Sequence, residues 1–196
     1  MSAVMTEGAR EDQVLKTAEA LIIQKRSLAI SFNEIAAILG VSRSLLYVYF
    51  DSVPSIIDAL FLAHAKDLET RIEPALQKQA PFRARAVEAN LAYLEYVVEA
   101  GPLLQLVLRE RHQDSPLGDN SRRMFRTILR RIASEVAGGL RVTAREAFVF
   151  LELTSAIPES LGRLARENQI DIETARSTCE RLVGVSIDTI VPTAVG

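Results

Sequence analysis

The sequence contains little of what several classes of protein need. Only one of its 196 residues is a cysteine, Cys179, which excludes an internal disulfide framework and a multi-cysteine zinc site. No apolar run approaches the roughly 20 residues that a membrane-spanning helix needs. The first residues include the acids Glu7, Glu11 and Asp12 and no apolar stretch, unlike a secretory signal. We therefore expect a cytoplasmic protein with no membrane partner.

The chain also lacks an excess of positive charge. It has 23 Lys and Arg against 25 Asp and Glu, and a formal net charge of −2. A protein that coats nucleic acid through charge alone needs a strongly basic surface, so any DNA binding must come from a local site. The contents of 48% apolar and 24% charged residues are typical of a folded chain. The length fits one domain, or a small module joined to a larger one.

Strict alternation of apolar and polar residues, the pattern of half-buried strands, is rare in this sequence. Apolar residues instead recur at spacings of three and four, as in Val14, Ala18 and Leu21, which indicates amphipathic helices. Capping pairs such as Ser31 with Glu34 mark helix starts. The sequence predicts an all-α protein, a three-helix N-terminal module followed by a six-helix bundle. The expected helices are 10–26, 32–39, 43–49, 54–79, 82–100, 103–112, 118–138, 144–168 and 172–190.

Two short helices joined by a tight turn are predicted within residues 31–50. Gly40 follows the first helix, where a left-handed residue ends a helix without strain, and Ser42 caps the second. Leu46 and Phe50 point inward from the second helix. This spacing is typical of a helix-turn-helix, whose second helix can enter the major groove, and also of an ordinary helical corner. The outward face of the second helix carries Arg43, Ser44, Leu45, Tyr47, Val48 and Tyr49.

Residues 35–60 closely resemble the DNA-binding module of the TetR (tetracycline-repressor-like) family of bacterial regulators. Their sequence is IAAILGVSRSLLYVYFDSVPSIIDAL. The length and helix count fit that family over the whole chain. The resemblance implies a helix-turn-helix DNA-binding domain at 1–53, an effector-binding and dimerisation domain at 54–196, and a homodimer. The motif residues are Ile35-Ala36, Gly40-Val41-Ser42, Leu46-Tyr47-Val48-Tyr49-Phe50 and the aliphatic run from Ile56 to Leu60.

The resemblance also implies roles for single residues in binding double-stranded DNA. Arg43 would donate two hydrogen bonds to guanine, and Leu45 would touch a thymine methyl group. Tyr47 and Tyr49 would bind phosphates, which adds affinity without base preference. The start of the preceding helix would hold a phosphate on the opposite wall of the groove. The residues expected at DNA are Ser31, Asn33, Ser42, Arg43, Ser44, Leu45, Tyr47 and Tyr49.

Three features depart from the family pattern. Arg26-Ser27 stands after the first helix, where members have glycine and an aromatic residue. A left-handed arginine there costs of order 1 kcal/mol, unless the turn is built differently. Val53-Pro54 occupies the start of the fourth helix, where members have a phosphate-binding lysine. Residues 1–51 carry five basic and six acidic side chains. These features predict few phosphate ion pairs and modest non-specific affinity.

Members of the family enclose a small-molecule pocket within the second domain, and the resemblance implies an apolar or aromatic effector here. Such pockets are mostly apolar with a few fixed polar groups. His64, Tyr93 and Tyr96 combine an apolar body with a polar tip, although plain bundle core is the better explanation for any single one of them. The expected lining is Phe61, His64, Tyr93, Tyr96, Leu104, Val107, Phe125 and Ile128.

The last two predicted helices are too apolar for helices with a single buried stripe. Large exposed apolar area usually marks an interface, so we expect these helices to form the homodimer; a fully internal helix pair is the alternative. The residues expected at the interface are Phe148, Leu151, Leu161, Ile172, Ala175, Cys179 and Leu182.

An enzyme is the main rival class, and the sequence offers little for catalysis. Neither His64 nor His112 has a glutamate three residues before it, so the di-iron bundle motif is absent. No glycine-rich phosphate loop, nucleophile elbow or metal-spaced cluster occurs, and we expect no cofactor and no metal.

The sequence therefore predicts a ligand-responsive repressor that is not an enzyme. Two recognition helices about one DNA turn apart, roughly 34–36 Å, would read a palindromic operator. Effector binding would move the connecting helix 54–79 and release the DNA. The alternatives are a regulator of the same fold that acts through protein contacts, and an all-α small-molecule-binding protein or enzyme.

Overall fold

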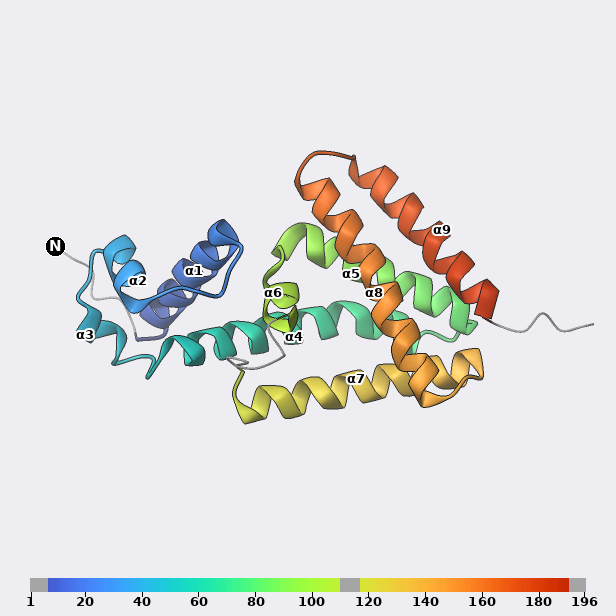
Figure 1. Cartoon of the computed structure of the whole chain (residues 1–196), viewed down its shortest axis with the longest axis horizontal. Helices are drawn as coiled ribbons and strands as arrows, with labels where there is room; N and C mark the ends of the chain where they lie inside the picture. Colours follow the sequence, from blue (N-terminus) through green and yellow to red (C-terminus); the bar gives the residue numbers. More distant parts are fainter. Residues whose placement is uncertain (1–6, 110–116, 191–196) are drawn as a thin grey trace, which may run out of the picture. The chain divides into compact units, whose positions relative to one another are not determined.

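The computed structural model describes residues 7–109 and 117–190, which form nine α-helices and no strand (Figure 1). The all-α prediction is confirmed. Within these residues no helix is both long enough and apolar enough to cross a membrane. The helices are α1 (Glu7–Lys25), α2 (Phe32–Leu39), α3 (Arg43–Leu46), α4 (Val53–Gln77), α5 (Phe82–Ala100), α6 (Leu103–Arg109), α7 (Asp119–Leu140), α8 (Ala144–Arg166) and α9 (Ile172–Ile190).

Three helices, α2, α5 and α9, begin and end at the predicted residues. For α2 the reason is local: the Ser31 side chain accepts the backbone N–H of Glu34, and Gly40 ends the helix at φ 65°. The largest differences are three residues: α1 begins at Glu7 and not at residue 10, and α3 ends at Leu46 and not at Tyr49. Residues 110–112 of the expected sixth helix lie outside the described residues.

The chain divides into two compact units. The first contains Met1–Ala65 and Pro102–Arg123, and the second contains Lys66–Gly101 and Met124–Gly196. The helices α4 and α7 each contribute residues to both units. This division reflects packing; the functional domains 1–53 and 54–196 stay a prediction.

In the first unit α1 packs on α2 and on α6, and α2 packs on α3. Apolar side chains of α1 four residues apart, Val14, Ala18 and Ile22, are fully buried, together with Ile35 of α2. Burying a large aliphatic side chain contributes about 1.5–3 kcal/mol to stability, so this shared core fixes the helix-turn-helix. Leu46 of α3 is also buried, at 1% exposure, which anchors the second helix of the motif.

The turn after α1 has the left-handed arginine that the sequence predicts as one of two solutions. Arg26 has φ 52°, and the backbone N–H of Ser27 donates to the carbonyl oxygen of Ile22 at 3.3 Å. This bond satisfies a carbonyl group at the helix end. The left-handed residue is an arginine, and this conformation costs about 1 kcal/mol for a residue other than glycine.

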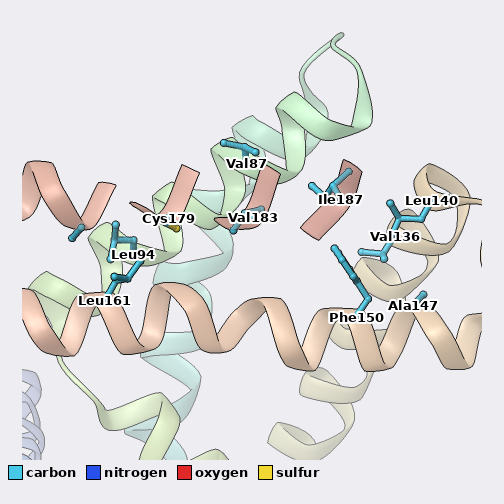
Figure 2. Packing of buried hydrophobic residues seen from close by; sticks show 11 residues of the cluster. Val87, Leu94, Val136, Leu140, Ala147, Phe150, Leu161, Cys179, Val183 and Ile187 are labelled. Carbon is cyan, nitrogen blue, oxygen red and sulfur yellow. The ribbon is translucent and has the colours of Figure 1, made fainter. Parts of the chain in front are cut away.

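In the second unit α5, α8 and α9 pack on one another, and the end of α7 joins their core (Figure 2). Side chains from the four helices converge there. The buried residues are Val87 and Leu94 of α5, Val136 and Leu140 of α7, Ala147, Phe150 and Leu161 of α8, and Ala175, Cys179, Val183 and Ile187 of α9.

Candidate functional site

The recognition segment, residues 42–50, is held by its two ends. Ser42 has an extended backbone and accepts the N–H of Leu45 at 3.3 Å, which caps α3. The backbone N–H of Phe50 donates to the carbonyl oxygen of Leu46 at 3.0 Å. Leu46 and Phe50 are buried, as the sequence predicts. The segment therefore presents its opposite face outward, with Arg43 and Ser44 exposed.

Arg43 and Tyr47, expected to have separate roles, are in direct contact. The Arg43 Nη2 donates a hydrogen bond to the Tyr47 hydroxyl at 2.6 Å. The guanidinium carbon also lies 5.4 Å from the centre of the Tyr47 ring. The same ring also contacts Phe32 of α2 in a T-shaped arrangement, with ring centres 4.7 Å apart. Three side chains, one from α2 and two from the recognition segment, thus form one connected group.

The remaining residues of the segment differ in exposure. Ser42 and Ser44 are exposed and share a hydrogen bond of 2.9 Å between their hydroxyls. Leu45 and Tyr49 are half-buried, so only part of each is accessible to DNA. Val48 is 68% exposed and is missing from the expected contact set, although the sequence pattern puts it on the outward face.

The start of α2, where a phosphate is expected, carries an acid beside the predicted contacts. The Ser31 hydroxyl donates to the Glu34 carboxylate at 2.8 Å, and Lys25 Nζ lies 2.5 Å from the other carboxylate oxygen. The hydrogen bond from Lys25, followed by the one from Ser31, lowers the pKa of Glu34. Asn33 is exposed. Ser31 and Lys25 are thus both engaged with Glu34. The sequence predicts the capping pair of Ser31 and Glu34 but not the contact with Lys25, which belongs to a different helix.

The departure at the start of α4 has a structural counterpart. Ser52 and Ser55 exchange backbone-to-side-chain hydrogen bonds of 3.2 and 3.3 Å, which cap the helix. Pro54 stands in the first turn, where a backbone N–H is not needed. The cap stabilises the helix start with hydroxyl groups and without a cation.

The expected effector residues fall into the two units. In the first, Phe61, Leu104 and Val107 are buried and His64 is half-buried. The Nε2 of His64 lies 3.0 Å from Glu19 Oε1, which ties α4 to α1.

In the second unit Tyr93 and Tyr96 of α5 are neighbours, with stacked rings 6.3 Å apart. Tyr96 is fully buried, whereas the Tyr93 hydroxyl donates to Glu159 of α8 at 2.8 Å. Phe125 and Ile128 of α7 are half-buried. Among the described residues no group of three His, Cys, Asp or Glu could hold a metal ion.

The residues expected at a dimer interface separate into exposed and buried ones. Phe148, Ile172 and Leu182 are 43–48% exposed, and Leu151 is half-buried. Further exposed apolar side chains on the same two helices are Val149, Leu153, Val185 and Ile190.

Leu161, Ala175 and Cys179 belong to the core of the chain itself and have little or no surface to offer a second copy. On α9 the buried residues Ala175, Cys179, Val183 and Ile187 recur every four residues and form its inner face. Burial raises the pKa of the Cys179 thiol to about 11.

Comparison with known proteins supports the fold. No protein-family profile and no curated protein sequence matches the chain. Among solved structures, it is similar to a TetR-like transcriptional regulator from Rhodococcus sp. RHA1, with TM-score 0.69, 18% identity and coverage of 91% of this chain and 96% of that one. A TetR-family regulator from Streptomyces coelicolor has TM-score 0.59, 20% identity and coverage of 95% and 90%.

A third similar structure is the fatty acid degradation regulator FadR from Bacillus halodurans, with TM-score 0.65, 12% identity and coverage of 97% of this chain and 99% of that one. All three similarities extend over nearly the whole of both chains. Identities this low establish a shared fold. The chain has the fold of the TetR-like transcriptional regulators, as the motif in residues 35–60 predicts.

Proposed function

We propose that the protein is a DNA-binding transcriptional regulator and not an enzyme. The observation that carries this proposal is the recognition segment: it is capped by Ser42, anchored by Leu46 and Phe50, and presents Arg43 outward. A short helix held in this way can enter a major groove, where arginine recognises guanine through its two acceptors. The TetR-like fold supports the same function.

The charges around the segment support sequence recognition with modest non-specific affinity. Lys25, which reaches the first turn of α2 beside the predicted phosphate contacts, is paired with Glu34. Few cations are therefore free to bind phosphates, so binding should depend weakly on salt. Asn33, Ser44 and Tyr49 supply neutral contacts instead.

We test DNA binding with the full-length protein by selection from randomised duplex DNA. The wild type should enrich a palindrome, and Arg43→Ala should relax the preference at one symmetric pair of base positions by about 5- to 150-fold. The matched control is Arg145→Ala, which removes an exposed arginine of α8, far from the recognition segment in sequence. Failure of the wild type to enrich any sequence would reject DNA recognition and favour a regulator that acts through protein contacts.

A homodimer through α8 and α9 would bring two recognition segments to one palindrome. The exposed apolar side chains of these helices support this arrangement, because contiguous apolar surface is costly to leave in water. Leu182→Glu should yield monomer, since it would bury a charge in the interface. The control is Ser177→Glu, an exposed position on α9 about 140° around the helix from Leu182. A monomeric wild type in sedimentation at micromolar concentration would refute the dimer.

We further propose that a small apolar or aromatic molecule binds within residues 54–130 and releases the DNA, which makes the protein a repressor. The stacked pair of Tyr93 and Tyr96 supports an apolar site with a polar edge. Fatty acids are one class to test, given the name of the similar Bacillus regulator. A ligand should raise the melting temperature of the protein. It should weaken operator binding in proportion to its preference for the dimer conformation that does not bind the operator. A ligand that stabilises the protein and leaves operator affinity unchanged would contradict the repressor role.

A further inference from the structure

The group formed by Phe32, Tyr47 and Arg43 links the fold of α2 to the side chain that would read DNA. Phe32 is 4% exposed, so its position is fixed by the core of the first unit. Its contact with the Tyr47 ring limits the positions of that ring, which is otherwise 46% exposed. The Tyr47 hydroxyl and ring then hold the Arg43 guanidinium.

The geometry of this contact is that of helix neighbours four residues apart. Although α3 ends at Leu46, Tyr47 keeps helical backbone angles, φ −67° and ψ −13°, so its side chain lies on the same face as Arg43. The sequence spacing alone allows the pair; the edge-on contact with Phe32 is the additional feature that makes the ring a fixed support.

The pairing leaves Arg43 able to recognise a base. A guanidinium carries five N–H donors, and the bond to Tyr47 uses one of them. Two more are sufficient for the bidentate contact with guanine. A tyrosine hydroxyl that accepts from Arg43 also keeps its own hydrogen, which it can donate to a phosphate. The same hydroxyl can therefore bind a phosphate of the DNA and also orient the base-reading side chain of Arg43.

We propose that Tyr47 is a positioning residue for base recognition, which holds the Arg43 guanidinium in the orientation that reads the base. This inference rests on the proposed DNA binding and changes the role that the family resemblance implies for Tyr47, which is phosphate binding without base preference. An unsupported arginine can reach several acceptors, phosphate oxygens included, and so distinguishes bases less well. Sequence preference at the base read by Arg43 therefore depends on the Tyr47 hydroxyl.

The experiment compares four variants, Tyr47→Phe, Arg43→Ala, the double variant and Tyr49→Phe, with the wild type. The measured quantity is the Kd for an operator changed at the Arg43-dependent base pair, divided by the Kd for the selected operator. Tyr47→Phe should reduce this ratio about two- to tenfold, the value of one hydrogen bond. Tyr47→Phe keeps the ring and its contact with Phe32, and a melting curve checks that it is folded.

The double variant should have the same ratio as Arg43→Ala, because Tyr47 acts through Arg43. Tyr49→Phe, the matched control, removes a phosphate-binding hydroxyl from the same segment; it should raise both Kd values alike and leave their ratio unchanged. A readout in the free protein needs no DNA: heteronuclear NMR should show restricted rotation of the Arg43 guanidinium in the wild type and free rotation in Tyr47→Phe.

The outcomes separate this inference from the proposed function. If Tyr47→Phe weakens binding to all sequences alike and the ratio stays at its wild-type value, the positioning role is wrong and DNA recognition stands. If the Arg43 guanidinium rotates freely in the wild type, the positioning role is also wrong. If the wild type enriches no sequence, the proposed function fails, and the inference fails with it.

Discussion

Two adjacent glycines near the end of α7, Gly138 and Gly139, allow a controlled test of the packing of the second unit. A Cβ at Gly138 would meet nothing within 4 Å, whereas a Cβ at Gly139 would lie 2.2 Å from the ring of Phe82. Both positions lie in the same helix, so replacement by alanine changes helix propensity to a similar extent. The two variants therefore differ mainly in contact with Phe82.

The expected magnitudes follow from this difference. Alanine is favoured over glycine within a helix by about 1 kcal/mol, and less near a helix end, so Gly138→Ala should stabilise the protein by about 0.5–1 kcal/mol. At Gly139 the ring must move by more than about 1 Å to reach ordinary contact distance, and such overpacking costs about 1–3 kcal/mol. Gly139→Ala should therefore be destabilising, by up to about 2 kcal/mol.

The assay is the free energy of unfolding from urea titration, at one protein concentration because an oligomer's stability depends on it. The variant Phe82→Leu should remove most of the clash, so Gly139→Ala should be less harmful in that background than in the wild type. Equal stabilisation by both alanine variants would refute the close approach of Phe82 to α7.

Two further predictions concern single residues. Arg26→Gly should stabilise the protein by about 0.5 kcal/mol, because the relief of the left-handed conformation exceeds the added entropy of the unfolded chain; the urea midpoint measures this, and no change would contradict the left-handed turn. Cys179 should resist alkylation at pH 8 in the folded protein, since its raised pKa of about 11 keeps it a thiol. Labelling should occur only in denaturant; fast labelling of the native protein would contradict the burial.

The sequence predicts the fold well where its signals are local. Ser31, Glu34 and Gly40 determine the start and the end of α2, and both are found at the predicted residues. The spacing of Leu46 and Phe50, four residues apart on one helix face, also predicts that both are buried. These features depend on residues within one helical turn of each other, so spacing and residue type contain the necessary information.

The sequence predicts less well what depends on the packing between helices. Lys25 reaches Glu34 across the turn after α1, and no local pattern indicates that contact. The contact of Arg43 with Tyr47 is compatible with their spacing, but the support from Phe32 requires the angle between α2 and the recognition segment. On α9 the sequence does not distinguish an apolar face turned toward α5 and α8 from one turned outward.

The inner face of α9 has a consequence for which substitutions the protein tolerates. Ala175 and Cys179 are small, and both are fully buried in the core of the second unit. Truncating these small side chains removes little buried apolar surface, whereas enlarging them forces α9 away from the helices that it packs on. In a saturation mutagenesis experiment, variants with larger residues on the inner face should be depleted. Variants with polar residues at the outer positions Leu182 and Val185 should be depleted if two copies associate there. The two faces of one helix would thus be selected for different properties, small volume on the inner face and low polarity on the outer face.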